Sequence, residues 1–213
     1  MAPIPMTHPE SVAVSNKATR LQDHSMVVEQ LTSVARDVMN QAIDLLQNTL
    51  TDDKQLTYQS KYIPGSTIGK HLRHARDPYI LLSKAVLDFT SKSSNGRAPA
   101  TLTYDVRIHD IPMETSIAAG IEAFREAIKQ LEDISKYAPE DLPIVLTADT
   151  GPYRQTLNTT YGRELWFGSL HAIHHWSMIR VIAGELGLKM DANFGIAPAT
   201  INYHKSEGSK SKI

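Results

Sequence analysis

The stretch Gly162 to Gly187, GRELWFGSLHAIHHWSMIRVIAGELG, constrains the fold most, because it places histidines where the buried face of a helix should be. At about 100° per residue, one face of such a helix carries Gly168, His171, His175, Met178, Ile182 and Leu186. A neutral imidazole in an apolar core needs a partner for each ring nitrogen. The sequence therefore predicts that His171 and His175 point inward and meet a polar partner there.

A divalent metal ion is one partner that would satisfy both rings. A helical HxxxH pair presents two nitrogens to a single ion. A further ligand must come from another segment, and KHLRHARDPYILL offers His71 and His74 on one face of a helix that opens at Gly65-Ser66-Thr67. His174 lies at the edge of the face and is a weaker candidate. The alternative is that these histidines only pack in the core.

Composition limits the classes of function. The 213 residues suit one domain, and 41% apolar with 21% charged residues is typical of a globular protein. With 22 basic and 23 acidic side chains, and no basic run, the chain is not expected to bind nucleic acid. The absence of cysteine excludes disulfides and thiolate ligands, which leaves nitrogen and oxygen ligands for any metal.

Targeting signals are sparse. No apolar run reaches the ~18 residues of a membrane span, and MAPIPMTHPE lacks the pattern of a secretion signal. We therefore expect a cytoplasmic protein that does not associate with membranes. The last residues, Ser211-Lys212-Ile213, resemble the peroxisomal address S-K-L, so a peroxisomal location is the alternative.

Helical periodicity dominates the rest of the chain. Amphipathic helices are predicted from about residue 25 to 50, from residue 66 or 67 onward, from about residue 114, and from a start between 157 and 163 to about 187. Pro78 either kinks the second helix, because the His74 carbonyl loses its donor, or ends it. PIVLTAD favours a short strand or an extended segment. The prediction is an all-α four-helix bundle over residues 25–203, with a flexible arm at 1–24 and a disordered tail at 204–213.

These motifs resemble those of the DinB/YfiT-like metal-binding helical bundles. The resemblance rests on Thr67-Ile68-Gly69 followed by His71-Leu72-Arg73-His74, and on His171-Ala172-Ile173-His174-His175. RELWFGSLHAIHHWSMI and FGIAPATINY are also similar to segments of an uncharacterised DinB-like subfamily. The similarity extends roughly from Ser25 to Tyr203.

The resemblance implies a four-helix bundle that holds zinc, nickel or iron on three histidines. Carried over by motif, the ligands are His74, His171 and His175, with His71 as the substitute for His74. One departure is that Asp77 is followed by proline, where relatives often carry histidine. The family includes thiol-dependent transferases and many members without a known substrate.

The function predicted on this basis is that of a metal-dependent enzyme. A water or a low-molecular-weight thiol on the ion would become a nucleophile for hydrolysis or thiol transfer. Glu164 would act as a general base or hold a ligand in place, or else would only stabilise the helix N-terminus. Arg107 would bind an anionic small-molecule substrate, or else is a solvated loop charge.

The alternative is a non-catalytic metal-binding bundle that acts as a structural or interaction module. A structural site should be closed by a fourth protein ligand, and none is obvious beyond His71, His174 and Glu164. The resemblance also implies that the chain can form a homodimer, although its outward faces show no apolar stripe that we assign to an interface.

Overall fold

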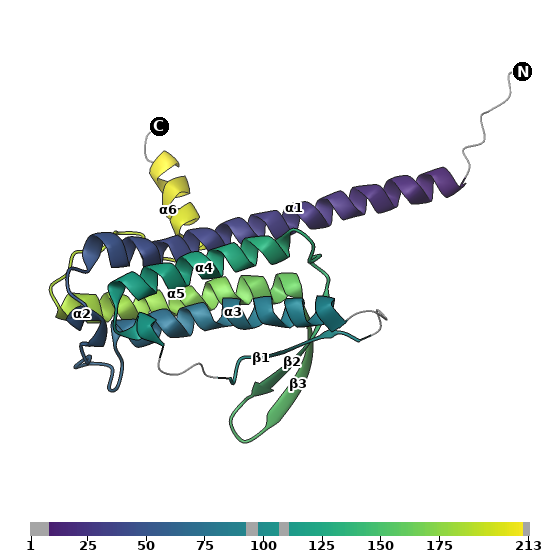
Figure 1. Cartoon of the computed structure of the whole chain (residues 1–213). Coiled ribbons are helices and arrows are strands. Elements are labelled where there is room, and N and C mark those ends of the chain that lie inside the picture. Colours follow the sequence, from purple (N-terminus) through teal and green to yellow (C-terminus); the bar gives the residue numbers. More distant parts are fainter. Residues whose placement is uncertain (1–8, 93–97, 107–110, 211–213) are drawn as a thin grey trace, which may run out of the picture.

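Four long helices form the body of the molecule. In the computed structural model, which describes residues 9–92, 98–106 and 111–210, they pack on one another lengthwise (Figure 1). They are α1 (Pro9–Asp44), α3 (Ile68–Lys92), α4 (Ile117–Ser135) and α5 (Tyr161–Glu185). Shorter helical elements connect or follow them, namely η1 (Leu45–Thr49), α2 (Lys54–Thr57), η2 (Pro112–Glu114) and α6 (Pro198–Lys210).

Hydroxyl side chains begin three of the helices. Thr67 Oγ1 accepts a hydrogen bond from the Lys70 amide (3.1 Å), as predicted for a cap at residue 66 or 67. The Ser116 and Thr160 hydroxyls cap α4 and α5 in the same way. Each cap satisfies an amide that the helix itself leaves without an acceptor. Each cap therefore fixes the residue at which its helix begins.

The core lies between the long helices and is centred on aromatic side chains. Trp176 and Phe124 are fully buried and meet edge to face, with their ring centroids 6.1 Å apart. The Trp176 indole donates to the Val38 carbonyl at 3.2 Å, so its polar atom is satisfied. Trp176 thus anchors the histidine-rich helix α5 in the centre of the bundle, and this fixes the position of its imidazoles along the helix axis.

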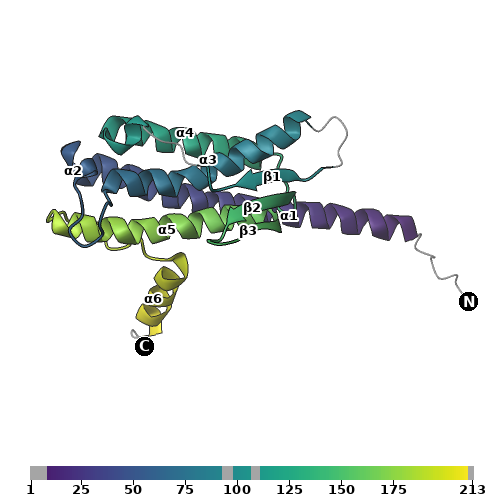
Figure 2. The ribbon, with the colours of Figure 1, turned by 90° about the horizontal axis from the view of Figure 1, so that it is seen from below.

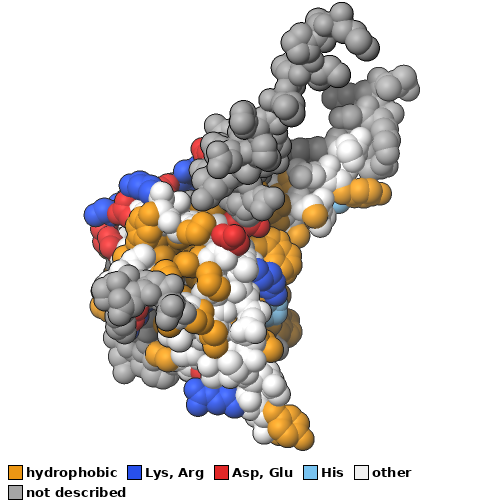
Figure 3. Space-filling view, turned by 90° about the vertical axis from the view of Figure 1, so that its right-hand side faces the viewer, with side chains coloured by type: hydrophobic (Ala, Val, Ile, Leu, Met, Phe, Trp, Pro, Cys, Tyr) orange, Lys and Arg blue, Asp and Glu red, His pale blue; other side chains and the backbone are white. Residues whose placement is uncertain are grey.

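A three-stranded sheet covers one side of the α3–α5 pair (Figures 1 and 2). Strand β1 (Ala100–Thr103) pairs in parallel with β2 (Pro143–Asp149), and β2 pairs antiparallel with β3 (Arg154–Thr160). Gly151, at φ +97°, makes the turn of the β2–β3 hairpin. Seen from the end of the bundle, the hairpin projects at the bottom of the molecule, and Lys and Arg form separate groups rather than a continuous stripe on this face (Figure 3).

The prediction of an all-α four-helix bundle is wrong, because the chain builds a mixed sheet as well. Only the segment Pro143–Asp149 was recognised as a strand candidate, and the structure confirms it. The other two strands give little hydrophobic signal: β3 is RQTLNTT, and its first five residues are exposed. β1 has only four residues. Strands this short or polar lack the alternation that identifies a half-buried strand.

Helices α3, α4 and α5 begin within about three residues of their predicted starts, whereas α1 begins at Pro9 rather than near residue 25. Helix α5 begins at Tyr161, within the predicted window, and α3 continues through Pro78 to Lys92, so the alternative in which Pro78 ends this helix is wrong. The limits of arm, bundle and tail stay predictions, as does the homodimer. No helix within the described ranges is long and apolar enough to cross a membrane.

Candidate functional site: a histidine cluster beside a pocket

Three histidines from two helices form a hydrogen-bonded chain. His71 of α3 and His175 of α5 approach through their Nδ1 atoms at 2.9 Å. The other nitrogen of His175, Nε2, lies 3.1 Å from His171 Nε2. Each contact needs one ring to donate and the other to accept. We call His71, His171 and His175 the histidine cluster.

The hydrogen bonds of the histidine cluster run in one of two directions. If His71 donates to His175, then His175 donates to His171, and the proton of His171 sits on Nδ1. If the direction is reversed, His171 Nδ1 carries a lone pair and His71 carries its proton on Nε2, an atom that is buried with no partner in the described part of the chain. A shift of tautomers thus converts the outer nitrogen of His171 between donor and acceptor.

Burial keeps the histidine cluster neutral. It lowers the pKa of His71 and of His171, and the charge of nearby His174 lowers both further. The pKa of His175 falls to about 3, mainly through burial and then through repulsion from His171 and the other neighbouring histidines. At neutral pH the cluster therefore offers lone pairs and N–H groups rather than positive charge.

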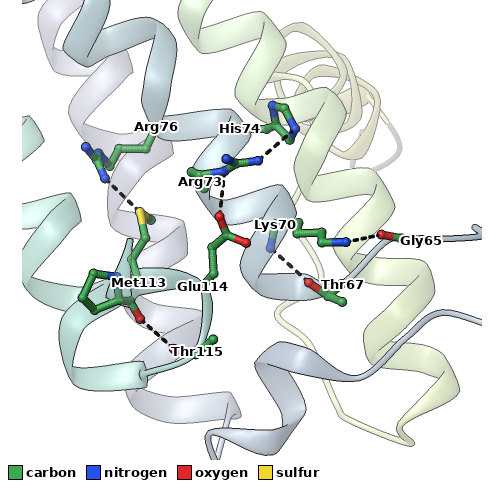
Figure 4. A network of polar contacts seen from close by, with 10 residues as sticks. Gly65, Thr67, Lys70, Arg73, His74, Arg76, Met113, Glu114 and Thr115 are labelled. Atoms are coloured by element: carbon green, nitrogen blue, oxygen red, sulfur yellow. Dashed lines mark hydrogen bonds and ion pairs between the residues drawn. The ribbon is translucent and has the colours of Figure 1, made fainter. Parts of the chain in front are cut away.

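His74 lies beside the histidine cluster rather than within its hydrogen bonds. Its ring stacks on that of His175 with centroids 5.6 Å apart and planes 8° from parallel. Arg73 orients it: the guanidinium lies 3.4 Å from His74 Nε2 and pairs with Glu114 of η2 at 3.0 Å (Figure 4). The sequence thus predicted the two helices whose histidines meet. Of the two candidates on α3, however, it is His71, the substitute for His74, that makes the closer contact with His175.

A pocket of about 550 Å³ opens beside His171, between α3, α5 and the segments that end β1 and β2. Its apolar lining consists of Pro78, Leu81, Val106 and Phe167. Its polar lining consists of His74, His171, Asp77, Asp105, Asp149 and the phenol of Tyr104. The pocket therefore combines apolar walls with a few convergent polar groups, as small-molecule sites do.

Glu164, the predicted general base, holds the wall of this pocket. Its carboxylate is buried and accepts from the Tyr104 hydroxyl (2.8 Å) and the Thr159 hydroxyl (2.7 Å). Burial and the charge of Glu164 raise the pKa of Tyr104 far above its usual value, so this phenol remains a donor. The Glu164 carboxylate thus joins α5 to β3 and to the segment after β1. Its role as a base stays a prediction.

Arg107, the predicted substrate-binding residue, lies outside the described residues. Of the ten described lining residues, the sequence identified only His74 and His171 as site candidates; the others include Asp77, Tyr104 and Phe167. Phe167 precedes His171 by one helical turn and could have been found by following the same face of α5. Tyr104 had no comparable signal, because its place depends on the unpredicted strand β1.

The histidine cluster does not fit a metal ion in the arrangement observed. No group of three or more His, Asp or Glu that could hold an ion occurs among the residues the structure describes. Nitrogens 2.9 and 3.1 Å apart hydrogen-bond to each other. Around one tetrahedral zinc, by contrast, nitrogens lie about 3.4 Å apart, since each Zn–N bond is near 2.1 Å. The ligand set His74, His171 and His175 stays a prediction.

Comparison with known proteins gives one relative. The chain is 32% identical over 173 residues to "FK506-binding protein 5" of Rhizopus delemar, and the alignment covers 80% of this chain but 37% of the relative. The chain thus spans little more than a third of that protein's length. No family model matches the chain, and no solved structure matches it.

These findings correct the identification made from the sequence. The assignment to the DinB/YfiT-like family is wrong, because the relative is an FK506-binding protein and the fold contains a sheet. The predicted metal-dependent hydrolase or thiol transferase, with its alternative of a metal-binding bundle, is overturned by the same relative and by the lack of a metal-holding group in the described ranges. What the chain shares with the relative is sequence over most of its own length.

Proposed function

We propose that this chain binds a small organic molecule in the pocket beside the histidine cluster. The observation that carries the proposal is that a pocket of about 550 Å³ has two imidazoles on its surface, those of His74 and His171, and burial lowers the pKa of His171. Its size is within the usual range for sites that enclose a small ligand. Buried histidines that pack only for stability have no need of such a pocket.

The walls favour a ligand with a flat apolar part. The rings of Tyr104 and Phe167 lie 5.5 Å apart and are inclined by 37° to each other. Stacked or edge-to-face contact with such rings stabilises an aromatic or cyclic group. His171 then provides one hydrogen bond, as donor or acceptor according to the tautomer of the cluster.

The pocket is organised before a ligand arrives. Tyr104 is held by Glu164, and His74 by Arg73, so neither ring must be ordered by the ligand. Ordering a side chain on binding costs roughly 0.5–1.5 kcal/mol, and preorganised groups avoid this cost. This rigidity supports a binding site rather than an incidental surface hollow.

Ligand-observed NMR with benzyl alcohol tests the proposal. We expect saturation transfer from the wild-type chain, and a signal at least about fivefold weaker from Phe167→Ala, which removes one aromatic wall. Leu87→Ala, at an exposed position of α3, is the matched control and should behave as wild type. Equal signals from wild type and Phe167→Ala would show that the probe does not occupy this pocket.

FK506 itself is a second candidate ligand, favoured by the similarity to a protein named for binding it. Because the chain covers 37% of that protein, the site that binds FK506 could lie in the shared or in the unshared part. Isothermal titration of the chain with FK506 distinguishes the two cases. Saturable binding supports this candidate, and loss of that binding in Phe167→Ala would place the compound in the pocket. If the titration shows no heat of binding, the candidate is ruled out.

A further inference from the structure

We infer that the pocket selects a ligand that carries a positively charged amine, with Asp77 as its counter-ion. The inference rests on the proposed function, since it specifies the class of ligand for the same pocket. It comes from one carboxylate oxygen, Asp77 Oδ1, that has no hydrogen-bond partner among the described residues, and from the absence of lysine and arginine in the described lining.

Asp77 is a buried carboxylate that the fold leaves incompletely satisfied. It is 7% exposed, it lines the pocket, and its Oδ1 atom has no hydrogen-bond partner among the described residues. A buried polar atom without a partner destabilises the fold, and such atoms are rare in folded proteins. A donor supplied by a ligand would remove that cost.

The neighbouring guanidinium groups each have another partner. Arg73 pairs with Glu114 at 3.0 Å, and Arg76 donates to Met113 Sδ at 2.9 Å (Figure 4). Both residues flank Asp77 on α3 and reduce its cost of ionisation, but burial still raises the pKa of Asp77 to about 6. At pH 7.5 the Asp77 side chain is therefore ionised and Oδ1 remains available to a ligand.

The rest of the lining also suits a cation. Asp105 and Asp149 add two carboxylates to the lining. Asp105 accepts a hydrogen bond from the Asp149 backbone amide, and Asp149 accepts one from the Gly151 backbone amide, each at 3.0 Å. No lysine or arginine occurs among the described lining residues, and burial keeps His171 neutral. The face of Tyr104 attracts cations as well as apolar groups, whereas the Arg163 guanidinium already lies over the Phe167 ring, 5.7 Å from its centroid. An ammonium beside an aromatic ring would match this lining.

Three aromatic probes of similar size but different charge test the inference. Benzylamine, benzyl alcohol and benzoate are each titrated into the protein at pH 7.5 with chelator present. We expect wild type to bind benzylamine about tenfold more tightly than benzyl alcohol, the effect of one charge-assisted hydrogen bond. Benzoate should bind more weakly than either. Asp77→Asn, of the same shape, should reduce the amine preference to less than about twofold.

The controls make the outcomes distinct. Asp88→Asn removes an exposed carboxylate from the same helix and should keep the wild-type preference. Equal affinities for amine and alcohol, or an amine preference that survives Asp77→Asn, would overturn the inference while leaving the pocket itself supported. Tighter benzoate binding would also overturn it and would favour the anionic substrate predicted from Arg107. If none of the probes binds, the proposed function fails instead.

Discussion

At His175 both ring nitrogens are engaged within the protein. Nδ1 contacts His71 and Nε2 contacts His171, so a neutral ring must donate through one nitrogen and accept through the other. A proton added to the acceptor nitrogen would turn that contact into donor against donor. The low pKa of His175, about 3, follows from burial together with this crowding.

The pH dependence of stability should therefore reflect His175. The unfolded chain protonates histidine near pH 6.5, whereas folded His175 stays neutral to about pH 3. Below pH 6.5 the unfolded state binds more protons, so the free energy of unfolding falls as pH falls, by at most about 2 kcal/mol from this residue at pH 5. Asp77, whose folded pKa is raised to about 6, opposes this trend partially, because the folded state takes up its proton first.

Chemical denaturation at pH 7.5 and pH 5.0 measures the effect. We expect His175→Gln to be less stable than wild type at pH 7.5 but to lose less stability on going to pH 5.0. His204→Gln, at an exposed position on α6, should keep the wild-type difference. The other titratable groups around His175 are His71, His74, His171 and His174, and they remain in both variants. An unchanged pH difference in His175→Gln would show that this ring does not titrate as described.

At the scale of elements, α3 and η2 approach so closely that only glycine fits between them. A Cβ on Gly69 would lie 2.1 Å from the Glu114 carbonyl oxygen, a backbone atom that cannot rotate away. We expect Gly69→Ala to lower the free energy of unfolding by about 1–3 kcal/mol, because the two segments must separate. That displacement would also move Glu114, which holds Arg73 and, through it, His74.

Gly184→Ala is the matched control. A Cβ there meets nothing within 4 Å, and the residue lies in the last turn of α5. Alanine should therefore stabilise the chain by about 0.5–1 kcal/mol, through reduced entropy of the unfolded state. Thermal or urea unfolding of both variants checks the pair; equal effects of the two substitutions would contradict the close approach at Gly69.

The sheet is attached to the helices through Glu164. Removing its carboxylate in Glu164→Ala leaves the Tyr104 and Thr159 hydroxyls without their acceptor. We expect a loss of about 2–3 kcal/mol in stability and weaker binding of benzyl alcohol, since Tyr104 lines the pocket. Asp88→Ala, which removes an exposed carboxylate from α3, is the control. If Glu164→Ala abolished a reaction without changing stability, the predicted role as a base would be supported instead.

The helices and the sheet differ in how far the sequence could predict them. Helices α3, α4 and α5 carry capping hydroxyls and long apolar faces, and these local signals determine them. The strand β3 depends on pairing with β2 from Pro143↔Thr160 to Asp149↔Arg154, and its own residues contain little information on that contact. The pocket needs the sheet, so Tyr104 could not be placed, whereas two helical faces sufficed to predict that histidines of α3 and α5 meet, although His74 and not His71 was the first choice from α3.

At the scale of the whole molecule, the histidine cluster links two of the long helices, α3 and α5. His71 belongs to α3 and His171 with His175 to α5, and the packing of these two helices also forms the floor of the pocket. A ligand that engages both helices would oppose their separation on unfolding. Such a ligand raises stability by an amount set by its concentration relative to its Kd.

The divalent metal predicted from the sequence can be tested through this linkage. It requires the imidazoles to move apart by a few tenths of an ångström from the separations of 2.9 and 3.1 Å. Under that prediction, zinc at about 100 times its Kd should stabilise the wild-type chain by about 2.7 kcal/mol. His175→Ala should remove the effect, and exposed His174→Ala should not.

Two further variants identify the ligand from α3. His71 already contacts His175 at 2.9 Å, whereas His74 stacks on it with ring centroids 5.6 Å apart. Moving His71 onto an ion is therefore the smaller change, so if zinc does stabilise the wild-type chain, His71→Ala should lose the effect while His74→Ala keeps it. Loss in His74→Ala alone would favour the ligand set predicted from the sequence. If zinc left the wild-type midpoint unchanged, the histidines would act only through their hydrogen bonds, and the pocket would bind its ligand without a metal.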